Sequence, residues 1–527
     1  MRYMLQCFRQ SMAPALALAA VCGLSAIAGG QQFQQPVPQG QGYVAGNTPI
    51  ANGPPFQAQA PVPPTQAASF ENGSATAPVP QPPPPPSAET ANADLTQRVA
   101  DLEKRLADLA KQGTTTTSGA PTRPLIVPTG RIQFDTAEFT QNAASNAEFG
   151  NVENAVGFRR ARIALLGGYQ TVDYIIEMDF ANRGIDSTID SKSQGTAFKD
   201  VYVQMHDLPL LGNIRAGHFK ECFGLEQVTS DNYTTFMERS ICDEGAFVPG
   251  RNDGIMTFNW SQDQRATWAA GVFTNQTGYD QPPLFQFDHW GLDATTRLTY
   301  LPWYDEPSGG RGVFHTGIDY AYRSAPDDIG IFATKTEAAF GPSVVNMTVN
   351  ATTPAKTTAL LDVNHWQVTG TEAALVYGPL SVQSEFFTAT VDQANNVTNH
   401  FYGGYAYVSY FLTGENRPYN RKMGVFDRVI PYEDFFRVRT SDGCVSTGKG
   451  AWEVAYRFSY IDMLDGLTTQ GAGRAADQTV GLNWYLNPFT RVMFNYVHSL
   501  DTYNIAAGKR VSGGIINEFM TRLAMDF

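Results

Sequence analysis

Two arginines with the spacing of a strand are the first residues that could do chemistry. Arg160 and Arg162 are two residues apart, and Ile163 and Leu165 follow with the opposite parity. Because successive side chains of a strand point to opposite faces, the two guanidinium groups share a polar face. A guanidinium group binds a carboxylate or a phosphate through several N–H donors. The spacing therefore predicts an anion-binding face.

Neighbouring charges allow a second interpretation of this pair. Asp173 and Glu177 fall on the polar face of the next stretch of alternating residues, so the two arginines could simply balance these carboxylates. Arg159 has the opposite parity to Arg160 and is expected at the rim of the structure.

Nothing in the sequence predicts catalysis or a resident metal. The seven histidines stand outside any Ser-His-Asp or zinc-binding motif, and no CxxC pair is present. His206 and His218 are expected in a wall or at a rim. We therefore expect no enzyme, no cofactor and no metal site.

The chain begins with the features of an export signal. Arg2 and Arg9 precede an apolar stretch, and Ala26-Ile27-Ala28 fits a cleavage site, so residues 1–28 are predicted to be a signal peptide. Cys22 raises the alternative of a lipoprotein, but Val21 stands where a small residue is preferred. The net charge of −13 argues against nucleic acid as a partner.

Cysteine usage predicts one disulfide. Cleavage of the signal leaves Cys222, Cys242 and Cys444 in an oxidising compartment, where three thiols suggest one bridge and one spare. Cys222 and Cys242 fall in the same predicted loop and are the expected pair.

Three segments separate the signal from the first strand. Residues 29–93 are rich in Pro, Gln and Ala and are predicted to form a disordered spacer. Residues 94–112 carry a 4-3-4-3 apolar spacing and are predicted to form a short coiled coil, and 113–129 is predicted to be a linker. The seam positions are Leu95, Val99, Leu102, Leu106 and Leu109.

The last eleven residues show the period of a half-buried strand. Phe519, Leu523, Met525 and Phe527 alternate with more polar neighbours, over a length that crosses a bilayer when tilted. Similar patterns recur from residue 130 to the end and give sixteen candidate strands. Their predicted starts are near residues 131, 157, 170, 198, 213, 254, 266, 289, 312, 366, 380, 400, 451, 476, 491 and 515.

The connections favour a closed membrane barrel over a soluble sandwich. Breaks at Gly167-Gly168, Gly378-Pro379 and Asn487-Pro488 predict tight turns on one side. The stretches 141–156, 182–197, 221–253 and 324–365 predict long loops on the other. The predicted fold is therefore all-β, a 16-stranded antiparallel transmembrane barrel over 130–527, in the bacterial outer membrane with the N-terminal segment periplasmic.

Six segments of this predicted barrel resemble the phosphate-selective porin O and P family. They are FRRARI (158–163), GHFKECFGLEQ (217–227), TFMERS (235–240), SYFLTGE (409–415), GAWEVAYRFSY (450–460) and VGLNWYLNPFTRVMFNYVH (480–498). The resemblance implies a trimeric sixteen-stranded barrel with inward-folded segments that narrow the pore. It also implies passage of small anions, with phosphate or polyphosphate favoured.

The resemblance also implies which basic residues line the pore. Lys220, Arg239 and Arg251 belong to or flank the third outer loop, which folds inward in such porins, and Arg215 is expected to line the same pore. Basic groups in a constriction lower the barrier for anions.

A long basic connection is expected on the periplasmic side. By strand count, Gly414–Lys449 joins the twelfth and thirteenth strands, where turns are normally short. Its basic and aromatic residues predict a segment folded back into the lumen, with Arg421, Lys422 and Arg428 at the inner mouth. The alternative is a solvated periplasmic flap.

The overall charge disagrees with simple anion selectivity. Of 37 Lys and Arg residues, 30 follow residue 129, whereas 44 of the 50 Asp and Glu residues do. A general or cation-preferring porin is therefore the alternative, as is a structural barrel linking the outer membrane to other envelope layers. The expected partners are outer-membrane lipids, anions in transit and two further copies of the chain, held through the barrel and the coiled coil. Periplasmic or cell-wall contact through the N-terminal segment is also expected.

Overall fold

The computed structural model describes the barrel and several of its loops. The described residues are 125–181, 197–209, 211–243, 246–276, 290–325, 328–347, 360–394, 396–439, 445–467, 472–506 and 509–527. The predicted signal peptide, spacer and coiled coil, together with Cys444, lie outside these residues.

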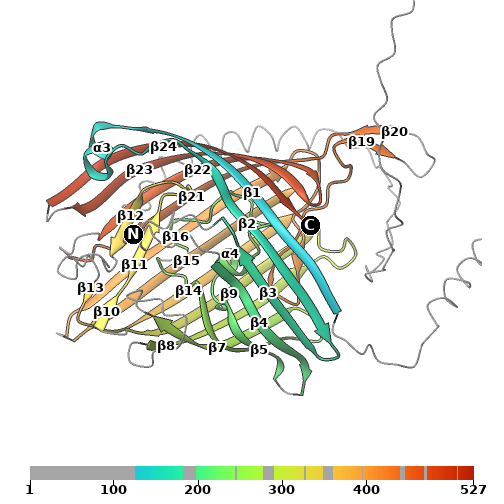
Figure 1. The fold of residues 1–527 in the computed structure, drawn as a ribbon, viewed down its shortest axis with the longest axis horizontal. Coiled ribbons are helices and arrows are strands. Elements are labelled where there is room, and N and C mark those ends of the chain that lie inside the picture. The colour runs from blue at the N-terminus through green and yellow to red at the C-terminus, as the bar shows by residue number, and fades with distance from the viewer. Residues whose placement is uncertain are drawn as a thin grey trace, which may run out of the picture. The chain divides into compact units, whose positions relative to one another are not determined.

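Sixteen antiparallel strands form a closed barrel, with each strand bonded to its neighbours in chain order (Figure 1). The barrel strands are β1 (Leu125–Gln141), β2 (Ala155–Tyr169), β3 (Val172–Asp179), β4 (Ala197–Leu208), β5 (Gly212–Lys220), β6 (Arg251–Trp260), β7 (Ala266–Gln276), β8 (Trp290–Tyr304), β9 (Gly312–Ser324), β14 (Val363–Tyr377), β15 (Leu380–Gln393), β16 (Thr398–Phe411), β21 (Ala451–Asp462), β22 (Gly473–Asn487), β23 (Thr490–Ala506) and β24 (Lys509–Asp526). The predicted strand number and order are confirmed.

Two predicted boundaries need correction. The barrel begins at Leu125 rather than at residue 130, so the end of the predicted linker belongs to β1. The first tight turn is at Gln170 and Thr171 rather than at Gly167-Gly168, because β2 and β3 stay paired as far as Tyr169 and Val172. Gln170 takes a positive φ of 55°, which the turn requires and which no glycine supplies.

The last strand closes the ring against the first. Strand β24 pairs with β1 over eleven residue pairs, from Arg131–Asp526 to Gln141–Ile516. Phe527 and Gly130 then exchange two backbone hydrogen bonds, each 3.0 Å long. The predicted role of the C-terminal alternation is therefore confirmed.

Side chains of the barrel alternate between an apolar outer face and a polar inner face. On β3 and just after it, Ile176 and Phe180 project outward and are exposed, whereas Glu177 and Asp179 point inward and are buried. This agrees with the pattern of a membrane barrel. Among the described residues, no helix combines the length and the apolar character needed to span a membrane.

Among the described residues, three chain segments fold into the lumen. They are 221–243 and 246–250 with helix α4 (Leu225–Val228), 328–347 between β9 and β14, and 414–430 between β16 and β21. Below they are called the first, second and third inner segments. Four small sheets lie in the connections: β10 (Ile329–Gly330) pairs with β13 (Leu360–Leu361), β11 (Phe332–Lys335) with β12 (Ser343–Met347), β17 (Tyr419–Asn420) with β18 (Val425–Phe426), and β19 (Phe436–Arg439) with β20 (Val445–Gly448). Helix α3 (Ala143–Phe149) lies between β1 and β2.

Apolar clusters hold the inner segments against the wall. Phe247 of the first segment and Phe332 of the second pack in one cluster with Trp366, Phe387 and other residues of β9, β14, β15, β16 and β21. Met237 packs with residues of β1, β23 and β24, and Phe426 of the third segment packs with residues of β8, β9 and β14. These contacts attach all three inner segments to the inner wall of the barrel.

The predicted inward folding of Gly414–Lys449 is confirmed for its first half only. Phe426 is buried, and Arg297 of β8 donates to the carbonyl of Gly424 across 2.8 Å. Beyond residue 430 the chain turns outward: Phe435 and Phe436 are exposed, and β19 and β20 form a hairpin at the end of the barrel (Figure 1).

Candidate functional site

The first inner segment is fixed at its start by a carboxylate of the wall. Gly224 has a φ of 73°, a conformation that favours glycine, and it turns the chain into α4. The backbone N–H groups of Leu225 and Glu226 then donate to Glu385 of β15, across 2.6 and 2.9 Å. This pair of bonds sets the position of the residues that follow.

Arg457 of β21 joins two inner segments. Its guanidinium group lies 3.0 Å from Glu226 of the first segment and 2.6 Å from Glu337 of the second. All three side chains are almost completely buried. Since an unpaired buried charge is costly, the three charges hold each other in place.

Asp231 is the point of the first inner segment at which positive charge converges. Oδ2 lies 3.2 Å from Arg160 Nε, 3.7 Å from an Arg162 nitrogen and 3.9 Å from an Arg131 nitrogen. Oδ1 faces Lys220 at 4.0 Å and Arg239. Five basic side chains, four from the wall and one from the loop, therefore surround one carboxylate; we call this group the Asp231 cluster.

The basic groups of the cluster lower the pKa of the Asp231 carboxyl group. Burial alone raises the pKa of Asp231, but the nearby Arg160 and Arg239 outweigh burial and hold this pKa well below its usual range. Asp231 is therefore ionised at neutral pH.

Arg160 and Arg162 point inward, as predicted from their shared parity. Arg160 also donates to Gln133 across 2.8 Å. Arg162 pairs with Asp179 at 2.7 Å and Glu177 at 3.4 Å, so the alternative of balanced charge is correct for Glu177. It is wrong for Asp173, which lies instead near His206.

Arg159 does not follow its predicted parity. The register of β1 and β2 shifts at Gln133 and Phe134, which pair with Arg160 and Phe158, so Arg159 is an extra residue in a bulge. Its side chain bonds Glu238 of the first inner segment, at 3.0 and 2.9 Å. The predicted position at the rim is therefore wrong, because a bulge sends two consecutive side chains to one face.

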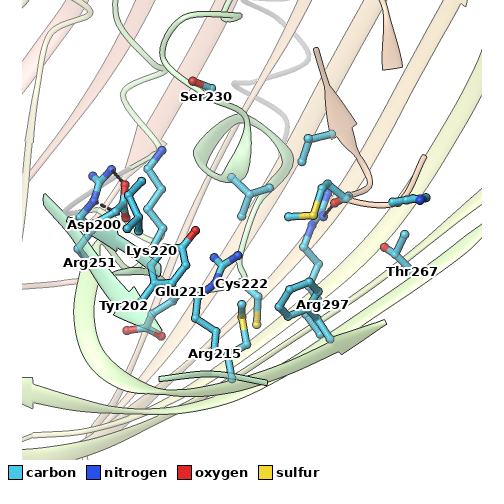
Figure 2. A pocket seen from close by; sticks show the side chains of 18 of the residues that line it. Asp200, Tyr202, Arg215, Lys220, Glu221, Cys222, Ser230, Arg251, Thr267 and Arg297 are labelled. Carbon is cyan, nitrogen blue, oxygen red and sulfur yellow. Dashed lines mark hydrogen bonds and ion pairs between the residues drawn. The ribbon is translucent and has the colours of Figure 1, made fainter. Parts of the chain in front are cut away.

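The remaining basic residues of the first inner segment and its flanks form hydrogen bonds or ion pairs with neighbouring residues. Lys220 donates to the carbonyl of Gln227 across 2.7 Å. Arg239 pairs with Asp231 and, at 3.1 Å, with Asp243. Arg251 forms two bonds with Asp200, as the dashed lines in Figure 2 show.

A cavity of about 240 Å³ extends along the inner wall from this cluster (Figure 2). Its lining includes Arg131, Lys220 and Asp231 from the cluster, and Arg215, Arg297 and Lys422 beyond it. Arg297 pairs with Glu372 at 2.8 Å, whereas Arg215 donates two hydrogen bonds to the amide oxygen of Gln204. Figure 2 shows Arg215 and Lys220 of β5 and Arg297 of β8 around this space.

The basic residues of the third inner segment have separate surroundings. Arg421 pairs with Glu306 at 2.9 Å, and Arg428 pairs with Asp526 and donates to the carbonyl of Pro488. Lys422 reaches the cavity, where its ammonium group lies 5.2 Å from the ring centre of Trp260. The structure thus places Lys422 in the same cavity as Arg215, and Arg421 and Arg428 elsewhere.

The expected disulfide is absent. Cys222 and Cys242 are both free and buried, and they belong to different apolar clusters. Cys242 donates to the carbonyl of Tyr460 at 3.0 Å, and Cys222 lies 3.6 Å from the carbonyl oxygen of Thr295. Membership in the same loop did not predict the disulfide correctly. Cys222 at the start of the first inner segment and Cys242 near its end pack against different parts of the wall.

Sequence reasoning missed Arg131, Arg297 and Arg457. Arg131 lies opposite Arg162 in the pairing of β1 and β2, and Arg297 lies opposite Asp319 in that of β8 and β9. Inward parity within each strand could have indicated all three. Among the described residues, no group of three or more His, Cys, Asp and Glu side chains could hold a metal ion.

Comparison with known proteins gives a family match over most of the barrel. The model of the family "Phosphate-selective porin O and P" matches residues 128–517. Porin O of Pseudomonas aeruginosa is 27% identical over 392 residues, which cover 70% of this chain and 81% of that protein. Among solved structures, an anion-selective porin from Comamonas acidovorans has 11% identity and a TM-score of 0.44, over 77% of this chain and all of that one.

A second solved structure, OmpT of Vibrio cholerae in its trimer form, gives 11% identity and a TM-score of 0.45, over 77% of this chain and 99% of that one. The family match covers well over half of the chain and coincides with the sixteen-stranded barrel. The chain therefore belongs to the phosphate-selective porin O and P family and is a porin of the bacterial outer membrane.

Proposed function

We propose that this porin conducts small anions and favours phosphate, and that the Asp231 cluster is the constriction through which they pass. The observation that carries the proposal is the convergence of four arginines and Lys220 on the single carboxylate of Asp231. An anion that approaches this group meets several N–H donors at once, which lowers its desolvation cost. The description of the family supports the same substrate class.

The acidic balance of the chain does not contradict this proposal. Some acidic side chains of the lumen hold the inner segments: Glu385 accepts hydrogen bonds from the backbone of α4, and Glu337 of the second segment pairs with Arg457. Neither carboxylate lines the cavity, whose acidic residues are Asp200, Glu221 and Asp231. The potential that an ion meets depends on the charges beside its path, and basic groups of the cluster lie there.

Phosphate suits the cluster better than chloride for a geometric reason. Guanidinium groups from β1 and β2 approach Asp231 Oδ2 from one side, and Lys220 of β5 approaches Oδ1. A tetrahedral oxyanion can accept hydrogen bonds from several of these donors at the same time, whereas a halide has no fixed acceptor geometry.

Reversal potentials of the purified porin in planar bilayers test the proposal. In a chloride gradient we expect the sign of an anion channel, and we expect added phosphate to reduce the chloride current. Lys220→Gln should weaken this reduction by about tenfold, the order of one charge-assisted hydrogen bond. Arg437→Gln, on the exposed β19–β20 hairpin, is the matched control.

Two results would contradict the proposal. A reversal potential with the sign of a cation channel would favour the general or cation-preferring porin instead. A Lys220→Gln channel with unchanged inhibition by phosphate would remove the Asp231 cluster from the path of the ion.

The assembly proposed is a trimer with a short parallel coiled coil on the periplasmic side. The apolar spacing of residues 94–112 supports the coiled coil, and residues 1–28 and 29–93 are proposed as signal peptide and spacer. Cross-linking in mild detergent should give trimers. A truncated chain that begins at Pro121 should remain trimeric but dissociate more easily, and monomers from both chains would contradict the proposal.

A further inference from the structure

We propose that the cavity beyond the Asp231 cluster is a second anion site, built for organic anions that join a carboxylate to a flat apolar body. Arg215 is the group that would bind the carboxylate, and the aromatic and aliphatic wall around it would take the body. This inference rests on the proposed anion conduction, because it places the site in the same lumen.

Arg215 is held by aromatic rings rather than by carboxylates. Its guanidinium carbon lies 4.1 Å from the ring centre of Tyr202, 5.2 Å from that of Phe258 and 5.4 Å from that of Phe219. Two of its nitrogens, Nε and Nη2, donate to Gln204 Oε1 across 3.1 and 2.7 Å. Within the described part of the chain Arg215 forms no ion pair, so no carboxylate neutralises its charge before an anion enters the cavity.

The other basic groups of the cavity are used differently. Lys220, Arg251 and Arg297 each have a carboxylate partner. Lys422 is exposed and has no ion pair among the described residues, but it faces the ring of Trp260. Two cations without a carboxylate therefore share one cavity, and each rests against aromatic surface.

The lining of this cavity has an apolar part, beside the carboxylates of Asp200, Glu221 and Asp231. Val228, Met256, Phe258 and Val425 contribute to it, and Cys222 adds a buried thiol. Apolar lining offers a phosphate ion no hydrogen bonds to replace its water shell. A flat hydrocarbon body, in contrast, gains by leaving water for such a surface, and it can stack on aromatic rings.

The position of Arg215 separates this site from the Asp231 cluster. Arg215 and Lys220 are on the same strand, β5, and lie five residues apart, which is roughly 16 Å along a strand. Lys220 is at the cluster, and Arg215 is nearer the short turn that precedes Gly212. An anion that leaves the cluster along the wall therefore meets Arg215 next.

The test compares benzoate, acetate and phosphate as inhibitors of the chloride current in planar bilayers. Benzoate and acetate carry the same charge at neutral pH, so a difference between them reports the apolar wall. We expect benzoate to inhibit at about tenfold lower concentration than acetate. Arg215→Met, which keeps the apolar volume, should abolish this advantage, and Lys422→Gln should reduce it.

Phosphate inhibition and the hairpin variant provide the controls. Arg215→Met should leave inhibition by phosphate at the Asp231 cluster within about twofold of the original. Arg437→Met, on the exposed hairpin, should leave inhibition by both phosphate and benzoate unchanged. Because Lys422 is exposed, its variant gives an answer even if Arg215→Met fails to fold.

Three outcomes would overturn the proposal: equal inhibition by benzoate and acetate, a benzoate effect unchanged in both Arg215→Met and Lys422→Gln, or a parallel loss of phosphate and benzoate inhibition. The last would mean one shared site. If the proposed function is wrong, the reversal potential has the sign of a cation channel. Inhibition by benzoate can still be measured in that case, as a decrease in the total conductance.

Discussion

Arg160 of the barrel wall and Asp231 of the first inner segment form an ion pair with 3.2 Å between Nε and Oδ2. The pair joins a residue of a wall strand to a residue of an inner segment, whose backbone carbonyl also accepts a hydrogen bond of 3.1 Å from Arg491 of β23. Since four other basic groups share the same carboxylate, Asp231 competes with any passing anion for the same donors.

Asp231→Asn should strengthen anion binding. The amide keeps the shape of the side chain and removes its charge, so the five basic groups lose the carboxylate that they share and interact more strongly with a mobile anion. We expect phosphate to inhibit the chloride current at about tenfold lower concentration, equivalent to ~1.4 kcal/mol. Asp434→Asn, on the exposed outward chain, is the control. Weaker inhibition in Asp231→Asn would show that the carboxylate organises the site rather than competing for it.

Glu221, in the loop that follows β5, should give the channel a pH dependence near neutrality. Burial, opposed by Arg323 and aided by nearby Asp293, raises the pKa of Glu221 to about 7. As the pH falls from about 8 to 6, the carboxyl group becomes neutral and the cavity loses a negative charge. Anion selectivity should therefore rise, as measured by reversal potential.

The same pKa predicts a stability change of defined sign. A carboxyl group whose pKa is higher in the folded than in the unfolded protein stabilises the fold at low pH, and this contribution is lost as the pH rises from about 4 through 7. Glu221→Gln should remove both pH effects and keep the selectivity found at low pH. Glu433→Gln, exposed outside the lumen, should leave them intact. A pH profile unchanged by Glu221→Gln would assign the titration to another group.

Arg457→Met should release the first and second inner segments without opening the barrel. It leaves Glu226 and Glu337 as unpaired buried charges, which typically costs about 3–5 kcal/mol. We expect trypsin to cut at Lys335 or Arg239 in detergent, while the heat-dependent gel mobility of the barrel persists. Resistance to trypsin equal to that of Arg437→Met would contradict the role of Arg457.

Cys222 and Cys242 should be reduced and unreactive in the folded porin. Burial raises the pKa of the Cys222 thiol to about 12, so very little thiolate exists at pH 8. Alkylation of both should require denaturation but no reductant. A disulfide-linked peptide in a non-reduced digest would contradict the structure at this point.

The barrel itself was predictable because its signal repeats. In each strand, apolar outward side chains alternate with polar inward ones, as at Ile176 and Glu177, because backbone geometry turns successive side chains to opposite faces. The same alternation recurs along the chain from strand to strand. The inward direction of Arg160 and Arg162 followed from the same rule. That rule failed at Arg159, because a bulge depends on pairing with β1 and not on the sequence of β2 alone.

The interior of the site was less predictable for a physical reason. Which loop carboxylate meets which wall arginine depends on contacts between residues far apart in the chain, such as Asp231 with Arg131 and Glu337 with Arg457. No local pattern encodes these pairs. The connection Gly414–Lys449 shows the same limit: its aromatic residues predicted inward folding throughout, yet Phe426 is buried and Phe435 is exposed.

The apolar clusters between the inner segments and the wall divide the lumen-facing positions of this barrel into two populations. Positions such as Phe387 and Phe401 behave as the core of a soluble domain, so substitutions there lower the stability of the fold and change ion selectivity only as a consequence. Positions on β4–β7 around Arg215 border open space, and their substitutions change transport first. A library that varies all inward positions equally would therefore mostly sample misfolded porins, whereas one confined to the second population would sample new permeabilities.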